Sequence, residues 1–250
     1  MRGPLKDVMR AAADLLFPVT CAACERLLDA GESGVICGRC LLGVRELPHP
    51  RCDRCGHPIG SYTCRWCPLL PAFVRAARSF CWIGAGTGGD IVHALKYGGW
   101  VRAAPAIAQR MQRVPWPRDV IEERTATVAV PLALSRLRER GFNQSVLLAG
   151  HLASAWGIPS WPDAIERTRA TRSQTELTPA ERLGNVAGAF RVSRPALSSI
   201  HGAHLILVDD VVTTGATLKA CASALFASGA RTISYMTFGR APASGDRVIP

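Results

Sequence analysis

Four C-x-x-C pairs lie within the first 70 residues of this 250-residue chain, and they limit what that part of the chain can fold into. A C-x-x-C turn brings two sulfurs within reach of one ion, and zinc takes four thiolates in a tetrahedron, so two pairs complete one site. Disulfides within each pair would close loops too short to constrain the unfolded chain much, and a redox-active C-x-x-C normally occurs once, beside a βαβ unit. We therefore predict two structural zinc ions in closed sites. Their ligands are Cys21, Cys24, Cys37, Cys40, Cys52, Cys55, Cys64 and Cys67.

The spacing leaves the pairing of these cysteines open between two arrangements. Sequential sites would use the first four cysteines for one ion and the last four for the other, whereas a cross-brace would interleave them. We favour sequential sites. A region this short, with so little apolar periodicity, needs such a metal to fold. Cys81 and Cys221 lie in strand-like and helix-like patterns, where we expect buried thiols.

From residue 71 onward, short β-like runs alternate with helical patterns, which is typical of a parallel α/β sheet. The expected strands are 79–83, 127–130, 204–208 and 232–238, and the expected helices are 90–97, 101–112, 143–155, 179–187 and 216–228. Asn143 is the expected N-cap of the helix at 143–155. We therefore predict an amphipathic helix at 1–20, a double zinc ribbon at 21–70, an α/β domain at 71–243 and a frayed tail at 244–250.

Residues 205–217 are the most informative stretch of the α/β part and read Leu-Ile-Leu-Val-Asp-Asp-Val-Val-Thr-Thr-Gly-Ala-Thr. Four apolar residues predict a buried strand that ends at Asp209 and Asp210, and a hydroxyl- and glycine-containing loop then opens a helix. In an open α/β sheet, ligands bind off the carboxyl ends of strands, and a helix N-terminus presents unpaired N–H groups to a phosphate. Two carboxylates there suit vicinal hydroxyls, or Mg²⁺ held through water. The segment indicates a ribose that carries a phosphate, and it matches neither the P-loop nor the dinucleotide motif.

These thirteen residues match the signature of type I phosphoribosyltransferases, and the chain as a whole resembles the ComF (competence protein F) family. Members of that family are amidophosphoribosyltransferase-like proteins with an N-terminal double zinc ribbon. The resemblance runs from Cys21 to about Arg240. Besides the signature it rests on His93-Ala-Leu-Lys96-Tyr97, Val130-Pro131-Leu132, Arg138-x-Arg140-Gly141-Phe142-Asn143-Gln144, Arg167, Gln174, Arg182, Asn185 and Phe190.

The resemblance implies a type I phosphoribosyltransferase-like parallel sheet flanked by helices, with a small N-terminal zinc-ribbon module. It also implies that the protein binds phosphoribosyl pyrophosphate with Mg²⁺ and transfers the phosphoribosyl group, with release of pyrophosphate, to an acceptor that the sequence does not name. Asp209 and Asp210 would be the catalytic pair that binds the ribose hydroxyls. The 5′-phosphate would be cradled by Thr213, Thr214, Gly215, Ala216 and Thr217.

By the same resemblance, a long basic loop after strand 127–130 takes the pyrophosphate position of the fold, with Arg136, Arg138 and Arg140. Arginines hold a diphosphate by charge-assisted hydrogen bonds, although a solvated helix face is the alternative for these three. The fold has a mobile flap at the position of Arg167, Arg169, Arg172 and Arg182. Lys96 either caps its helix or reaches the anion site. We expect His93 and His151 to be ordinary helix residues.

The net charge of +11 implies an anionic partner but does not choose between nucleic acid, a membrane surface and a polyphosphate metabolite. The resemblance to the ComF family implies the alternative function, a nucleic-acid-binding accessory protein of DNA uptake in natural competence that uses the fold as a binding module, with single-stranded DNA as its partner. No apolar run approaches the roughly 18 residues of a membrane span. Charged residues interrupt the apolar positions near the start, so we expect no signal peptide and a cytoplasmic location.

Overall fold

The computed structural model describes residues 19–29, 32, 34–59, 64, 66–168, 188–242 and 246. Its centre is a six-stranded sheet in the order β1-β2-β8-β7-β3-β4, in which every neighbouring pair is parallel except β1 and β2. Its strands are β1 (Val44–Glu46), β2 (Val74–Gly86), β3 (Arg124–Ala129), β4 (Ser160–Trp161), β7 (His204–Val212) and β8 (Thr232–Arg240). A separate antiparallel pair is formed by β5 (Ile165–Arg167) and β6 (Phe190–Val192).

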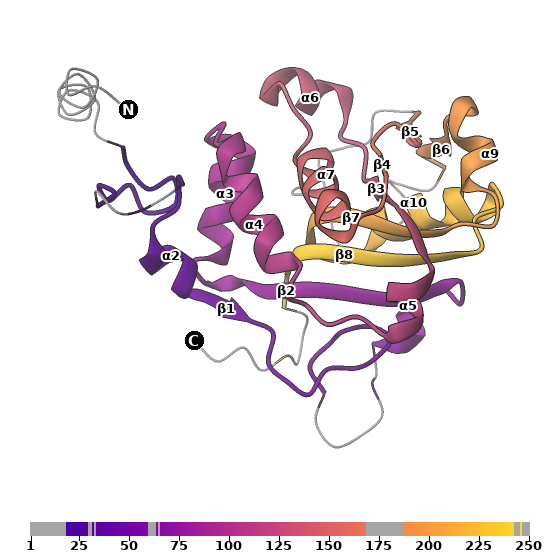
Figure 1. The fold of residues 1–250 in the computed structure, drawn as a ribbon, viewed down its shortest axis with the longest axis horizontal. Coiled ribbons are helices and arrows are strands. Elements are labelled where there is room, and N and C mark those ends of the chain that lie inside the picture. Colours follow the sequence, from indigo (N-terminus) through magenta and orange to yellow (C-terminus); the bar gives the residue numbers. More distant parts are fainter. Residues whose placement is uncertain are drawn as a thin grey trace, which may run out of the picture.

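Helices cover both faces of the sheet (Figure 1). On one face, α3 (Gly88–Tyr97), α4 (Ala104–Met111) and α7 (Gln144–Trp156) pack on a core that includes Ile206 and Val208 of β7. On the other face, α10 (Ala216–Ala227) and the β5–β6 pair pack on a core that includes Leu205 and Leu207. Successive residues of a strand point to opposite faces, so the buried run of β7 serves both cores.

Shorter elements complete the described chain. They are α2 (Gly38–Leu42), η1 (Cys67–Leu69), η2 (Val101–Ala103), α5 (Arg118–Glu123), α6 (Leu134–Arg140), η4 (Arg194–Ala196) and α9 (Leu197–Ile200). Figure 1 shows α6, which contains the three arginines predicted for a diphosphate, standing out from the sheet.

The predicted parallel α/β fold is confirmed, and the four expected strands correspond to β2, β3, β7 and β8. The strand that contains the acidic pair differs from its prediction, because β7 continues past Asp209 and Asp210 to Val212. Its partner β8 runs alongside as far as Arg240 and supplies the backbone hydrogen bonds for this extension. The expected helices at 1–20 and 179–187 lie outside the described residues, apart from residues 19 and 20.

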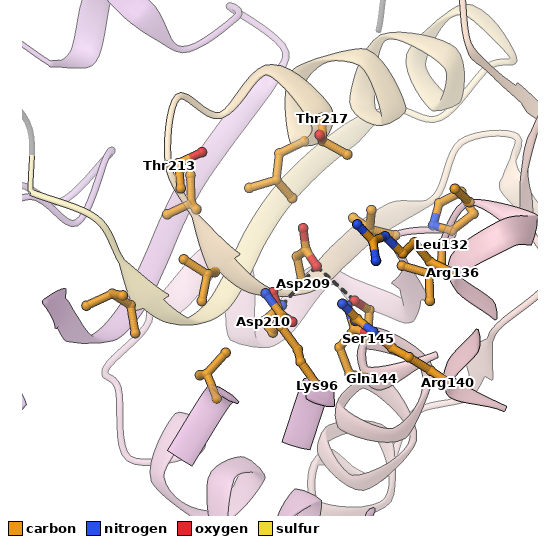
Figure 2. Close-up of a pocket in the computed structure, with 18 of the residues that line it drawn as sticks. Lys96, Leu132, Arg136, Arg140, Gln144, Ser145, Asp209, Asp210, Thr213 and Thr217 are labelled. Carbon is orange, nitrogen blue, oxygen red and sulfur yellow. Dashed lines mark hydrogen bonds and ion pairs between the residues drawn. The ribbon is translucent and has the colours of Figure 1, made fainter. Parts of the chain in front are cut away.

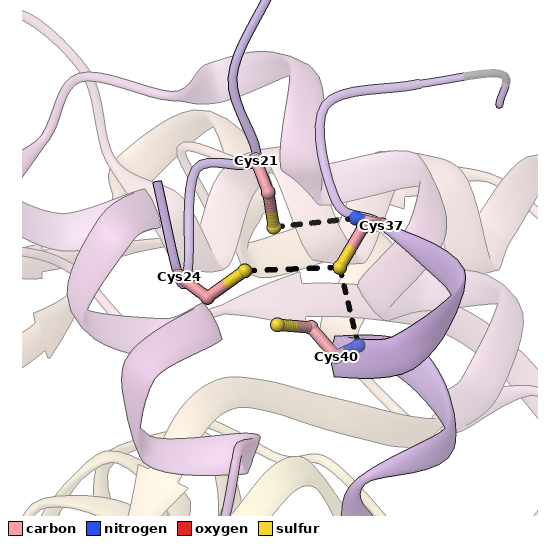
Figure 3. Close-up of side chains that lie close together, drawn as sticks. All are labelled: Cys21, Cys24, Cys37 and Cys40. Carbon is pink, nitrogen blue, oxygen red and sulfur yellow. Dashed lines mark hydrogen bonds between the residues drawn. The ribbon is translucent and has the colours of Figure 1, made fainter. Parts of the chain in front are cut away.

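The eight ribbon cysteines form two groups of four, and the grouping is sequential. The first group holds Cys21, Cys24, Cys37 and Cys40 (Figure 3), and the second holds Cys52, Cys55, Cys64 and Cys67. Within each group the sulfur atoms lie within 4.8 Å of one another. A tetrahedral zinc with four sulfurs at about 2.3 Å places those sulfurs about 3.8 Å apart, so each group has the size and the donor set of a closed structural zinc site.

Backbone N–H groups orient the sulfurs of the first group. The Cys37 N–H donates to Cys21 Sγ at 3.3 Å, and the Cys40 N–H donates to Cys37 Sγ at 3.4 Å (Figure 3). The second of these hydrogen bonds lies at the start of α2, where Cys37 is the N-cap. Such N–H donors stabilise thiolates, which are the form that binds zinc.

The zinc module is joined directly to the α/β sheet. Its strand β1 forms the sheet edge beside β2. Near the second group, Arg240 at the end of β8 donates from Nη2 to the Cys55 carbonyl oxygen at 2.8 Å, and its Nη1 lies 3.2 Å from His57 Nδ1. The two predicted regions therefore share a sheet edge and a hydrogen-bond network.

Asp246 departs from the prediction of a frayed tail at 244–250. Its Oδ1 lies 2.8 Å from His57 Nε2, and its side chain is 3% exposed. Because Arg240 donates to Nδ1 of the same imidazole, His57 is the Nε2–H tautomer, which donates to the carboxylate. The zinc module thus holds a residue close to the C-terminus.

Among the described residues, no helix combines the length and the apolar character that crossing a membrane requires.

We expect the purified protein to contain about two zinc ions per chain, one for each cysteine group. Cys24→Ser should remove one of them, because a closed four-thiolate site loses most of its affinity with one ligand. Cys221→Ala is the matched control, since Cys221 is buried in α10, outside both groups, and should leave the zinc content unchanged. Elemental analysis measures both variants. Protein free of zinc, with oxidised ribbon cysteines, would contradict the assignment.

Candidate functional site

The sheet changes its winding direction between β3 and β7. After β3 the chain passes through α6 and α7 to β4 at one edge, whereas after β7 it passes through α10 to β8 in the opposite direction. Helix α7 lies on one face and α10 on the other, so the carboxyl ends of β3 and β7 open a crevice between them. Ligands in open α/β sheets bind at such a point. A cavity of about 720 Å³ lies here and contains the predicted acidic pair (Figure 2).

Asp209 and Asp210 are held apart by different partners. The pairing of β3 with β7 ends at Val208, so Asp209 is the first residue of β7 beyond that pairing. Its Oδ1 accepts hydrogen bonds from Ser145 Oγ at 2.8 Å and from the Asp210 N–H at 2.9 Å. Asp210 faces the side of α3, where Lys96 Nζ lies 2.9 Å from its Oδ2 (Figure 2). Helix α7 therefore positions Asp209 and helix α3 positions Asp210, and both helices are distant from β7 in the sequence.

Burial raises the pKa of Asp209 to about 7, and the negative charge of Asp210 adds to this shift. The charge of Lys96 and the Ser145 hydrogen bond act in the opposite direction and offset part of it. A carboxyl group with this pKa is partly protonated at neutral pH. A ligand that brings hydroxyl donors or a cation therefore stabilises the ionised form, and perturbed carboxyl groups in a cleft are typical of functional sites.

The predicted phosphate loop leads into the N-terminus of α10. Gly215 is its N-cap with φ of 73°, a left-handed conformation that favours glycine. Thr214 Oγ1 accepts a hydrogen bond from the Ala216 N–H at 3.4 Å. Thr213 and Thr214 are exposed at the cavity, and Thr217 lies at the start of the helix (Figure 2). Hydroxyls and N–H groups thus converge at a helix N-terminus, which is a favourable place for an anion.

The basic segment after β3 is a helix rather than the expected loop. Helix α6 has no buried residue, so it is a solvated helix that stands over one side of the cavity. Arg136 and Arg140 line the cavity, whereas Arg138 is exposed and does not. Residues four apart share a helix face, and the residue midway between them points elsewhere. The prediction of three arginines for a diphosphate therefore reduces to two that face the cavity.

Both cavity-facing arginines have local partners. Arg136 Nη1 lies 2.8 Å from Glu139 Oε2. Arg140 Nη1 donates to Gln144 Oε1 at 2.9 Å, and its guanidinium lies 4.8 Å from the centre of the Tyr97 ring. These interactions hold the two half-buried arginines beside the cavity.

Arg167 and Lys96 both line the cavity as well. Arg167 ends β5, and its guanidinium lies 5.5 Å from the centre of the Phe190 ring. Lys96 lies in the last turn of α3, but its ammonium meets Asp210 and not an anion site. The other residues at the predicted flap and in the family pattern, namely Arg169, Arg172, Gln174, Arg182 and Asn185, lie outside the described part.

Sequence reasoning missed Ser145, which is buried and bonds Asp209. It did predict the residue that positions Ser145, because Asn143 is the N-cap of α7 and its Oδ1 accepts the Ser145 N–H at 3.0 Å. Asn143 Nδ2 also donates to the Val130 carbonyl oxygen at 3.0 Å and so ties the start of α7 to the end of β3. The N-cap pattern at Asn143 was the available signal, but a local pattern does not show that Ser145, two residues later, faces Asp209 of β7.

His93 also lines the cavity, although the sequence indicated an ordinary helix residue. Its ring lies 4.9 Å from that of Tyr97, centre to centre, one turn further along α3. His151 is exposed on α7 and does not line the cavity, in agreement with the sequence. The α3 side of the cavity therefore presents two adjacent rings.

Comparisons with known proteins agree with both parts of this structure. The double zinc ribbon domain family matches residues 12–69, and the phosphoribosyl transferase domain family matches residues 143–248. The sequential cysteine groups fall within the first match and the acidic pair within the second.

Among three relatives, one matches most of the chain, and two others match slightly less than half of it. DNA utilization protein YhgH of Salmonella typhi is 32% identical over 234 residues, which are 88% of this chain and 96% of that protein. Competence protein F of Haemophilus influenzae is 32% identical over 46% of this chain and 50% of its own length. Competence protein ComFC of Bacillus subtilis is 36% identical over 45% of this chain and 43% of its own length. With this coverage and this pairing of domains, the chain belongs to the ComF family, which includes DNA utilization protein YhgH and the competence proteins F and ComFC.

Proposed function

We propose that the cavity binds phosphoribosyl pyrophosphate together with Mg²⁺. The observation that carries the proposal is that one cavity joins an acidic pair, a hydroxyl-lined helix N-terminus and two arginines. Asp209 and Asp210 would accept hydrogen bonds from the ribose hydroxyls. The loop from Thr213 to Thr217 would hold the 5′-phosphate, and Arg136 and Arg140 would meet the diphosphate.

The donor set also fits Mg²⁺, which prefers carboxylate oxygens, water and ligand phosphates. Asp209 and Asp210 are the residues that would hold it, and when bound it would neutralise charge on the diphosphate. Asp209 already accepts a hydrogen bond from Ser145, and Asp210 already forms an ion pair with Lys96. The protein's own groups therefore set the orientation of the ribose before a metal arrives.

The reaction we propose is transfer of the phosphoribosyl group. The bond between the anomeric carbon and the diphosphate oxygen breaks, and pyrophosphate leaves with the bonding electrons. An acceptor nucleophile then bonds to the same carbon and loses its proton to solvent. The arginines stabilise the charge on the leaving group while the acidic pair orients the ribose, so positioning and electrostatics supply the catalysis.

A role in DNA utilization is the second candidate, and the names of the full-length relatives favour it. The chain carries a net charge of +11, and the exposed helix α6 presents three arginines to its surroundings. Cationic side chains bind the phosphates of single-stranded DNA irrespective of sequence. In this proposal the cavity binds a small ligand while the basic surface binds the strand.

Asp209→Asn is expected to weaken binding of phosphoribosyl pyrophosphate in Mg²⁺ by about 10- to 100-fold without lowering the melting temperature. The amide keeps an oxygen for Ser145 but loses the charge, and a hydrogen bond to a charged group contributes about 1.5–3 kcal/mol. Asp163→Asn is the control, since Asp163 is exposed outside the cavity. Calorimetric titration and thermal melts measure both effects. Unchanged binding with a lowered melting temperature would show that Asp209 only supports the turn.

The raised pKa of Asp209 predicts how stability depends on pH. Its folded-state pKa of about 7 exceeds the usual aspartate value, so the folded protein keeps this proton between about pH 4 and pH 7. The free energy of unfolding therefore falls as the pH rises through this window, by at most about 4 kcal/mol at about 1.4 kcal/mol per pKa unit. The melting-temperature advantage of Asp209→Asn over wild type should grow from pH 4 to pH 7 and then level off. Parallel melting profiles for the two proteins would rule out this assignment.

Helix α6 separates the two candidate functions. Arg136→Ala and Arg140→Ala should weaken phosphoribosyl pyrophosphate binding, whereas Arg138→Ala should not, because Arg138 faces away from the cavity. Each of the three changes should weaken binding of single-stranded DNA. The slope of log affinity against log salt concentration should become shallower by about 0.7 for each phosphate that the protein no longer neutralises. Fluorescence anisotropy with a labelled oligonucleotide measures this, and no binding of the oligonucleotide at low salt would exclude the second candidate.

A further inference from the structure

A lysine ammonium lies against the acidic pair in this structure. Lys96 Nζ is 2.9 Å from Asp210 Oδ2, and the exposed fractions of the two side chains are 21% and 4% (Figure 2). Among the described residues, Lys96 is the cation that forms an ion pair with Asp210. Arg136 lies against Glu139 and Arg140 donates to Gln144, whereas the guanidinium of Arg167, a further cavity cation, lies over the Phe190 ring.

The fold fixes the place of this lysine. Helix α3 is anchored by Ile91 and Leu95, which are 1% and 0% exposed, and Lys96 follows directly in its last turn. The last turn of a helix also favours a cation, because its free carbonyl groups carry partial negative charge. The fold therefore holds the positive charge of Lys96 beside the acidic pair before any ligand binds.

Lys96 also comes from outside the part of the chain that supplies the rest of the acidic site. The phosphoribosyl transferase domain family matches residues 143–248, whereas α3 follows β2 in the preceding segment. Strand β2 pairs in turn with β1 of the zinc module. The N-terminal half of the chain thus supplies Lys96, and the C-terminal half supplies the two carboxylates and Ser145.

We propose that Lys96 is a built-in cation of the acidic pair, a positioning residue that takes over part of the role of a divalent ion when a ribose phosphate binds. The proposal rests on the proposed function. It implies that Asp210 keeps its orientation toward the ribose hydroxyls without a metal. It also implies that a free divalent ion competes with the ammonium, because two cations at one carboxylate repel each other.

The first test uses Mg²⁺ alone and does not depend on any sugar ligand. Lys96→Met should bind Mg²⁺ at least about tenfold more tightly than wild type, because the repelling charge is gone. Lys219→Met is the matched control, since Lys219 is exposed on α10 outside the cavity and undergoes the same change of charge. Calorimetric titration of all three proteins gives the comparison. Equal Mg²⁺ affinities for wild type and Lys96→Met would overturn the proposal.

The second test uses ribose 5-phosphate, with Mg²⁺ or with EDTA. Wild type should lose less than about tenfold in affinity in EDTA, whereas Lys96→Met should lose on the order of a hundredfold. Lys96→Arg keeps the charge and should restore binding in EDTA. A lysine with only a structural role would lower the melting temperature when replaced but leave the effect of Mg²⁺ on binding unchanged.

Wild type alone keeps the proposal testable if Lys96→Met does not fold. Ribose 5-phosphate that binds wild type in Mg²⁺ but not in EDTA would overturn it. Ribose 5-phosphate and phosphoribosyl pyrophosphate that bind in neither condition would refute the proposed function instead. In that case the Mg²⁺ affinities of wild type and a neutral variant, Lys96→Gln, still decide the role of Lys96, because loss of the ammonium predicts tighter Mg²⁺ binding and equal affinities would overturn the proposal.

Discussion

The repulsion between two neighbouring carboxylates on a buried strand is the constraint around which this site is arranged. Asp209 and Asp210 are adjacent on β7, and Asp210 is 3% exposed. Buried charges are costly unless they are paired or hydrogen-bonded. Here a hydroxyl from α7 donates a hydrogen bond to Asp209, and an ammonium from α3 forms an ion pair with Asp210. Burial, followed by the negative charge of Asp210, still raises the pKa of Asp209, so the pair gains from a ligand that brings hydroxyl donors or a cation.

The zinc module and the α/β sheet depend on each other. Two four-cysteine groups hold a region with few core residues, and strand β1 of that region extends the sheet. Arg240 and His57 link the second group to the end of β8, and Asp246 completes the network. Strand β2 pairs with β1, and its buried side chains share a core with those of α3. The metal sites therefore stabilise the element that presents Lys96, although they lie outside the cavity.

The arginines of α6 lie on more than one surface of the protein. Arg136 and Arg140 face the cavity, and Arg138 on the same helix faces away from it. The helix that carries them has no buried residue, so its position is set by its two ends and not by a core. One short helix thus presents cationic groups both to the cavity and to the outer surface. This arrangement is compatible with a family whose members bear names from DNA utilization and competence.

Local pattern in the sequence determined the four C-x-x-C pairs, the alternation of strands and helices, the threonine- and glycine-containing loop after β7, and the Asn143 cap. Each of these depends on spacing within a few residues, which a sequence displays directly. Only the tertiary structure decided that the cysteines group sequentially, that β7 continues past the acidic pair, and that α6 is a helix with Arg138 turned away from the cavity. It also decided the partners of Asp209 and Asp210, because Ser145 and Lys96 are distant in sequence and meet β7 only when α7 and α3 pack on the same face of the sheet. The physical reason is that hydrogen bonds and ion pairs are made in space, and the sheet order that brings these helices together depends on the packing of the whole chain.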